Sequence, residues 1–89
     1  MGAPDPALPV LLTVYEREHC HLCQDMIADL QELRSRYPFH LKVIDVDSDS
    51  DLQSCYGQRV PVLTMEGEEI CHYRLDLNAF ARIFQGIEK

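Results

Sequence analysis

Apolar and β-prone residues concentrate in four strand-like segments along the chain. Residues 10–15 are almost continuously apolar and β-prone, which predicts a strand buried on both faces. Residues 39–43 alternate between apolar and polar, as in a strand at a sheet edge with one face in solvent. Residues 60–65 and 69–74 predict two further strands, joined by a tight hairpin turn at Glu66-Gly67.

The helical period governs the remaining segments. From residue 23 to residue 37, apolar positions recur at steps of three and four, and Pro38 is expected to stop this helix. A short helix is expected over residues 49–56, ending at Gly57. Asp76 is the expected N-cap of a last helix. The apolar face of that last helix consists of Leu77, Phe80, Ala81, Phe84 and Ile87.

The order of these elements predicts an α/β fold. Two strands joined by a helix form a parallel pair with a right-handed crossover, whereas the short turn at residues 66–67 makes the last two strands antiparallel. We therefore expect a single domain over residues 10–89, in the order β-α-β-α-β-β-α, with a four-stranded mixed sheet and helices on both faces. Residues 1–9 contain three prolines and little that is apolar, so they are expected to form a flexible N-terminal tail.

Composition narrows the classes of function. A chain of 89 residues with 46% hydrophobic side chains can form one packed domain. Its 8 basic and 15 acidic side chains give a formal net charge of −7, which argues against binding to nucleic acid or to anionic membranes. The sequence shows neither an apolar run of membrane-spanning length nor a signal peptide, so we expect a cytoplasmic protein.

Four cysteines carry the strongest chemical signal. Cys20 and Cys23 form a Cys-x-x-Cys pair between the first strand and the first helix, the kind of junction at which α/β folds place their sites. At a helix amino terminus, unpaired amides and the helix dipole favour a thiolate, so the pKa of Cys20 should lie below the value of about 8.5 for a free cysteine. Cys20 is thus the predicted nucleophile, and Cys23, one turn inside the helix, is the predicted resolving thiol.

The residues of this loop leave other interpretations open. The two cysteines could be small apolar packing residues. With His19 and His21 they could also ligate zinc, to which only the isolated Cys55, Cys71 and His72 could add ligands. The thiolates of the pair could otherwise ligate a soft metal or an iron–sulfur cluster. A third alternative is a non-catalytic adaptor that uses the same face to bind a protein partner.

Three aspartates with alternating spacing form a second cluster of candidate ligands. Asp45, Asp47 and Asp49 resemble the start of a calcium loop, but the glycine and the distal glutamate of an EF-hand do not follow. We expect these side chains to cap a helix instead.

The remaining cysteines and two histidines are expected to be structural. Cys55 would lie on the short second helix and Cys71 on the last strand, both as packing residues. His40 and His72 are expected on strand faces, because neither has an acidic partner at a fixed spacing.

The motif Tyr15-x-Arg17-x-x-Cys20-x-x-Cys23, followed by Arg59-Val60-Pro61 and Gly67, resembles the small glutaredoxins of the thioredoxin superfamily. The resemblance extends over roughly residues 10–87 in motifs and in element order. It implies a thioredoxin-like fold and a thiol–disulfide oxidoreductase acting on protein or small-molecule disulfides. The cysteine pair itself carries two electrons, so no dissociable cofactor and no metal is expected.

The resemblance also implies roles for residues around the pair. In glutaredoxins the proline is cis and abuts the cysteines, and its flanking backbone hydrogen-bonds the bound thiol substrate. These roles carry over to Pro61 and Val60. Arg17 keeps the family's basic residue three positions before the first cysteine, and His21 could add positive charge beside it.

Several positions depart from the glutaredoxin pattern. His21-Leu22 replaces Pro-Tyr between the cysteines, and Arg59 replaces Thr before Val-Pro. Where glutaredoxins have Gly-Gly and then acidic residues that hold the amino end of glutathione, this chain has Cys71-His72 and then residues 73–75, Tyr-Arg-Leu. Arg74 has no acceptor for an ammonium group. We therefore expect glutathione to be a poor ligand, while the thiol–disulfide chemistry is retained.

Overall fold

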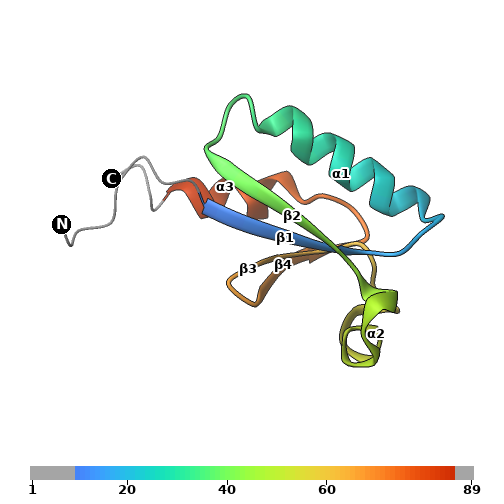
Figure 1. The fold of residues 1–89 in the computed structure, drawn as a ribbon. Coiled ribbons are helices and arrows are strands. Elements are labelled where there is room, and N and C mark those ends of the chain that lie inside the picture. The colour runs from blue at the N-terminus through green and yellow to red at the C-terminus, as the bar shows by residue number, and fades with distance from the viewer. Residues whose placement is uncertain (1–9, 86–89) are drawn as a thin grey trace.

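A computed structural model describes residues 10–85 of the chain (Figure 1). The predicted tail, residues 1–9, lies outside the described residues. The elements are β1 (Val10–Glu16), α1 (His21–Leu33), β2 (Phe39–Asp45), the 3₁₀ turn η1 (Val46–Ser48), α2 (Ser50–Tyr56), β3 (Val62–Met65), β4 (Glu68–His72) and α3 (Leu77–Gln85). Apart from η1, this is the predicted order. No helix in this part of the chain combines the length and apolar character needed to cross a bilayer.

The four strands form one mixed sheet in the order β2-β1-β3-β4. β1 pairs in parallel with β2 and antiparallel with β3, and β3 pairs antiparallel with β4. The β3–β4 turn places Glu66 and Gly67 at φ 54° and 84°, the left-handed region that a two-residue turn of this kind requires. The mixed sheet, the edge position of β2 and the hairpin turn are therefore confirmed.

The main core lies between one face of the sheet and the helices α1 and α3. Leu12 and Val14 of β1 point to this face and are fully buried. Phe80 of α3 packs with its ring edge-on against Tyr37 and Phe39, at centroid distances of 5.1 and 5.6 Å. The other buried members of this cluster are Met26, Leu30, Leu63 and Phe84.

The opposite face of the sheet is covered only at one end. There Tyr56 of α2 stacks on Tyr15 of β1, with ring centroids 4.2 Å apart, and Figure 1 shows α2 at the end of the sheet, away from α1. Helices thus lie on both faces, as predicted. Leu11, however, is 54% exposed, so the prediction that β1 is buried on both faces is wrong: α2 is too short to reach it.

Two predicted details of the helices also need correction. α1 ends at Leu33 rather than continuing to Pro38, although Tyr37 still packs against Phe80 and Phe84 from the turn that follows. Leu77, the first residue of α3, is 61% exposed rather than part of the buried face, which consists of Phe80 and Phe84. Ile87 lies outside the described residues.

Aspartates begin three of the helical segments. Asp45 caps η1 by accepting from the amide of Asp47 at 2.8 Å, and Asp49 caps α2 by accepting from Asp51 at 2.7 Å. Asp76 caps α3 through the amide of Ala79. The capping interpretation of the acidic segment is confirmed for Asp45 and Asp49, since a side-chain oxygen of each satisfies an amide that has no partner inside its helix. The carboxylate of Asp47 pairs with Arg17 instead.

Candidate functional site

The cysteine pair lies at the start of α1, where β1 has just ended. Cys20 is the N-cap residue, with extended backbone at φ −110° and ψ 107°, and α1 begins at His21. The two cysteines are joined by a disulfide bond, with their Cα atoms 5.2 Å apart. The amide of Cys23 donates a hydrogen bond to the Sγ of Cys20 at 3.1 Å. A helix amide is therefore already directed at the sulfur of Cys20.

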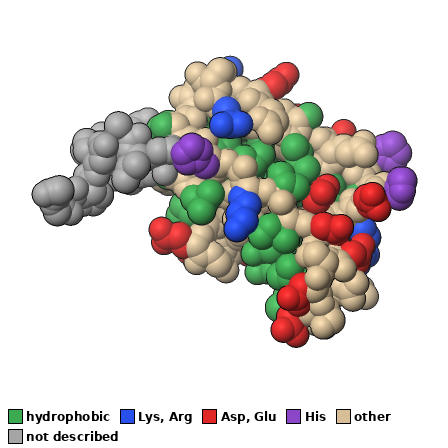
Figure 2. Space-filling model, viewed as in Figure 1, with side chains coloured by type: hydrophobic (Ala, Val, Ile, Leu, Met, Phe, Trp, Pro, Cys, Tyr) green, Lys and Arg blue, Asp and Glu red, His purple; other side chains and the backbone are tan. Residues whose placement is uncertain are grey.

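The two sulfur-bearing residues differ in exposure. Cys20 is partly exposed, whereas Cys23 is completely buried. His19 and His21 on either side of Cys20 are exposed, and Figure 2 shows histidine side chains at the end of the molecule where α1 begins. An incoming disulfide can therefore reach Cys20 but not Cys23, the asymmetry expected of a nucleophile and a resolving thiol.

Arg17 ties the loop before Cys20 to the segments that follow β2 and α2. Its guanidinium donates to both carboxylate oxygens of Asp47 at 3.2 Å and to the carbonyl of Gly57 at 3.3 Å. A Cβ atom at Gly57 would lie 2.6 Å from the carbonyl oxygen of Gln53 and 3.1 Å from Arg17 Nη2, so this close approach requires glycine. Arg17 thus has a structural ion pair, and its proposed substrate contact stays a prediction.

Negative charge surrounds the end of β1. Partial burial, with the carboxylates of Asp45 and Glu18 nearby, raises the pKa of Glu16 above its usual value. Glu16 and Asp45 are direct partners in the register of the parallel pair β1–β2. Figure 2 shows further acidic side chains around α2. Arg17 is therefore the local counter-charge to an acidic surface.

The second loop of the site contains Val60 and Pro61. The peptide bond between them is cis, and Pro61 is buried. The carbonyl of Pro61 accepts from the amide of Tyr73 at 2.9 Å. Between residues 10 and 85, the amide and carbonyl of Val60 have no backbone hydrogen-bond partner. The backbone of Val60 therefore retains an unused donor and acceptor.

Tyr73 is a residue that the sequence analysis did not place in the site. Its backbone is left-handed at φ 67°, and its hydroxyl donates to the carbonyl of Gln58 at 3.2 Å. Together with the bond to Pro61, this contact joins the β4–α3 loop to the loop before β3. The available signal was the substitution itself, a large aromatic residue close to where glutaredoxins have bare glycine backbone.

A charged network on β4 corrects the prediction for His72. His72 has an acidic partner, because its Nδ1 lies 2.6 Å from Oε2 of Glu69, which also pairs with Arg59. Residues three apart in a regular strand point to opposite faces, but the register shifts between Leu63 and Thr64, and this bulge turns both side chains to one side. Although partial burial opposes it, hydrogen bonds from His72 and Arg59 lower the pKa of Glu69 below its usual value.

The other cysteines and His40, which were expected to be structural, differ in their exposure. Cys55 is exposed on α2, so its predicted packing position is wrong; Cys71 is half-buried against the core, as predicted. Burial raises the pKa of Cys71, which keeps this thiol protonated at neutral pH. His40 is exposed on β2, as predicted. Within residues 10–85 the structure has no group of three or more His, Cys, Asp or Glu side chains placed to hold a metal ion.

Comparison with known proteins agrees with this fold. Residues 11–85 match the glutaredoxin-like domain family (DUF836). No protein of curated function matches the sequence. The resemblance to the glutaredoxins of the thioredoxin superfamily is thereby confirmed at the level of family.

Solved structures give the same result. The solution structure of protein Ne2328 from Nitrosomonas europaea is 41% identical, with a TM-score of 0.80, covering 93% of this chain and 98% of that one. The X-ray structure of protein XcR50 from X. campestris is 32% identical, with a TM-score of 0.66 and coverage of 84% and 96%. A thioredoxin variant from Halobacterium salinarum, 24% identical, has a TM-score of 0.58 and coverage of 99% and 97%. This last likeness concerns the fold alone, and the predicted thioredoxin-like fold is confirmed.

Proposed function

Because the chain belongs to the glutaredoxin-like domain family, we propose that it is a thiol–disulfide oxidoreductase whose reacting groups are Cys20 and Cys23. The observation that carries the proposal is the position of Cys20. Its sulfur caps α1, accepts the amide of Cys23 at 3.1 Å and is partly exposed, while Cys23 is buried within bonding distance. Such a position favours a thiolate, which is the nucleophile in disulfide exchange.

The reaction has two displacement steps. The thiolate of Cys20 attacks one sulfur of a substrate disulfide, forming a mixed disulfide and releasing the other substrate sulfur as a thiolate. Cys23, after losing its proton, attacks the Sγ of Cys20, which forms the Cys20–Cys23 disulfide and releases the second substrate thiolate. Two electrons pass from the protein to the substrate. An external thiol reductant then returns the pair to the dithiol.

The surrounding residues support substrate binding. The unused amide and carbonyl of Val60, held beside the buried Pro61, are suited to pair with the extended backbone of a bound substrate. His21 is exposed next to Cys20 and is available to contact the substrate, and Arg17 holds the loop that precedes it. Cys71 and His72 replace the bare glycine backbone of the glutaredoxins, and Tyr73 and Arg74 replace their acidic residues, so protein disulfides are favoured over glutathione. The reaction requires a reducing compartment, for which we favour the cytoplasm.

Trapping experiments test the assignment. The fully reduced protein should reduce a small disulfide such as hydroxyethyl disulfide, and the Cys20→Ser variant should lose that reaction. The Cys23→Ser variant should still react once and accumulate the mixed disulfide at Cys20, detectable as a mass increase. Replacement of the exposed Cys55 by serine is the matched control and should leave the rate unchanged. Full activity of the Cys20→Ser variant would refute the proposal.

A further inference from the structure

A groove starts near the cysteine pair and runs along α1 toward the end of that helix. One section lies beside Leu22, between α1 and the β4–α3 loop at Tyr73–Leu75, and measures about 230 Å³. A larger section of about 590 Å³ continues toward the end of α1 and is lined by Arg36, Leu75 and Leu77. The two sections share Asp29 and Leu75, so they adjoin, and we treat them together as one groove.

One wall of the groove is acidic. Asp25, Asp29 and Glu32 lie on α1 at spacings of four and three residues, which places them on one stripe of the helix. All three line the groove and are exposed, and none forms an ion pair within residues 10–85. The charged groups that do pair in this part of the protein lie elsewhere, at Arg17–Asp47 and around Glu69. The carboxylates of the groove are therefore free to meet a cation.

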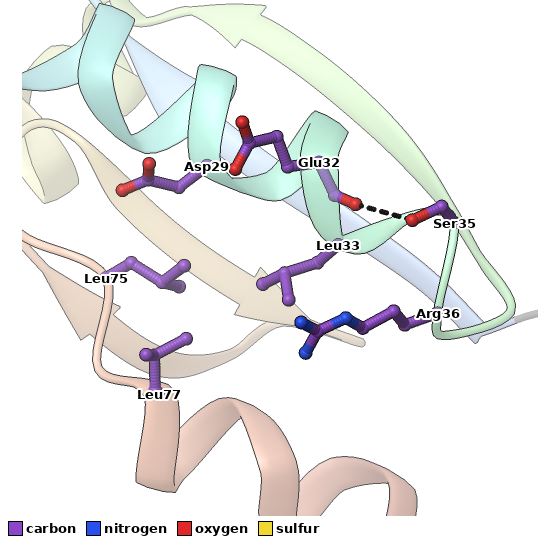
Figure 3. A pocket seen from close by; sticks show the side chains of 7 residues that line it. All are labelled: Asp29, Glu32, Leu33, Ser35, Arg36, Leu75 and Leu77. Atoms are coloured by element: carbon purple, nitrogen blue, oxygen red, sulfur yellow. Dashed lines mark hydrogen bonds between the residues drawn. The ribbon is translucent and has the colours of Figure 1, made fainter.

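Apart from Ser35 and the arginines Arg36 and Arg74, the rest of the groove lining is apolar. Figure 3 shows Leu33 from α1 and Leu75 and Leu77 from the other side pointing into the same space. Leu77 is 61% exposed and Tyr73 is 46% exposed, and these are two of the four large hydrophobic side chains most exposed in the described chain. Their exposure costs free energy in the unbound protein, and a ligand with an apolar side chain would recover it.

We infer that this groove binds an extended segment of a protein substrate, with a Lys or Arg side chain against Asp29 and Glu32 and an apolar side chain on Leu75 and Leu77. The inference rests on the proposed function, because the groove begins at Leu22, which directly precedes Cys23, so its near end lies beside the cysteine pair. It names the substrate class as polypeptides with a basic and apolar sequence beside the reactive cysteine.

Dimensions and charge fit a peptide. α1 has 13 residues and is therefore about 20 Å long. An extended chain rises about 3.3 Å per residue, so the groove accommodates about six residues. The net charge of −7 adds a long-range attraction for a basic segment and repels an acidic one. Arg36 lines the far end of the groove, and its positive charge would repel a basic side chain there. The basic residues of the ligand are therefore expected nearer to the cysteine pair.

Matched peptides test the inference. Two nine-residue peptides each carry one cysteine in a mixed disulfide with 2-mercaptoethanol. Among the six residues that flank this cysteine, one peptide has two Lys residues, and the other has two Glu residues at the same positions. We expect the reduced protein to react about tenfold faster with the Lys peptide, because each exposed ion pair contributes roughly a factor of three. The Asp29→Asn, Glu32→Gln variant should bring the two rates within about twofold of each other. The control is Glu66→Gln, Glu68→Gln, which makes the same charge change at the hairpin and should keep the preference.

The controls separate this inference from the proposed function. Hydroxyethyl disulfide is too small to reach the groove, so its reduction should be equal in all three proteins. If it is reduced but the peptides react equally, or if the preference survives in the Asp29→Asn, Glu32→Gln variant, the groove is not the recognition site. If hydroxyethyl disulfide is not reduced at all, the proposed function fails. The groove is then tested by fluorescence anisotropy of a labelled, cysteine-free Lys peptide, whose failure to bind would overturn the inference.

Discussion

The hydrogen bond from the amide of Cys23 to the sulfur of Cys20 gives a sharp prediction about reactivity. The perturbation is a pair of substitutions, Cys23→Pro and Cys23→Ala. Both remove the second thiol, but only proline removes the amide hydrogen that lies 3.1 Å from Sγ. Proline fits the first turn of a helix, because amides there have no intrahelical acceptor, and the hydrogen bond that the Cys23 amide makes is the one to Cys20.

The expected magnitude follows from the strength of one hydrogen bond to a charged group. Such a bond contributes about 1.5–3 kcal/mol, and 1.4 kcal/mol is a factor of about ten in an equilibrium. The equilibrium constant for ionisation of Cys20 should therefore be about tenfold or more larger in the Cys23→Ala variant than in the Cys23→Pro variant. The remaining amides and the helix dipole act equally in both proteins.

Alkylation by iodoacetamide as a function of pH measures this difference. In the Cys23→Ala variant the rate at Cys20, followed by mass spectrometry, should reach half its maximum well below pH 8.5, the region of a free cysteine. In the Cys23→Pro variant the midpoint should move up by about one pH unit, while circular dichroism shows that α1 is still formed. Equal midpoints in two folded variants would refute the assignment of this amide as a stabiliser of the thiolate.

Two further predictions concern stability. Glu16→Gln should stabilise the protein at neutral pH, because folding raises the pKa of this carboxyl above the unfolded pKa of 4.5. The wild type therefore loses stability as pH rises from 4.5 through the higher pKa of the folded state. The gain in urea unfolding should disappear below about pH 4, and a gain that persists there would contradict the electrostatic explanation. Phe80→Ala should cost about 3–5 kcal/mol, since Phe80 is 1% exposed, whereas Leu77→Ala at 61% exposure should cost much less in the same assay. Equal costs would show that the core is not centred on Phe80.

Local patterns in the sequence were sufficient for the elements and for the position of the cysteine pair. The apolar spacing predicted the edge strand and the two longer helices, because burial on one side of a strand or helix imposes that spacing. Continuous β-prone runs, the Glu66-Gly67 turn and Gly57 predicted the other strands and the short helix. Cys20 was correctly placed at the start of α1, since capping depends on residues within one turn. The same holds for Asp49 and Asp76, whose contacts are two and three residues away.

Contacts between distant segments could not be predicted in this way. The length of α1 was overestimated, since Tyr37 has the helical spacing but packs on Phe80 from a turn. Leu11 and Cys55 looked like core residues, but α2 does not extend over Leu11, and Cys55 lies on the exposed side of α2. The pairing of His72 with Glu69 depends on a bulge that no local spacing reveals.

The sequence by itself determined where the reactive sulfur lies along the chain and which helix begins at it, because N-capping and periodicity are properties of neighbouring residues. The tertiary structure alone decided that Arg17 meets Asp47, thirty residues away, and that Tyr73 joins the loop before Pro61. It also decided that the acidic stripe of α1 faces Leu75 and Leu77 across a groove. These arrangements depend on how the layers of the fold pack together, and packing is set by the sum of many weak contacts between residues far apart in sequence.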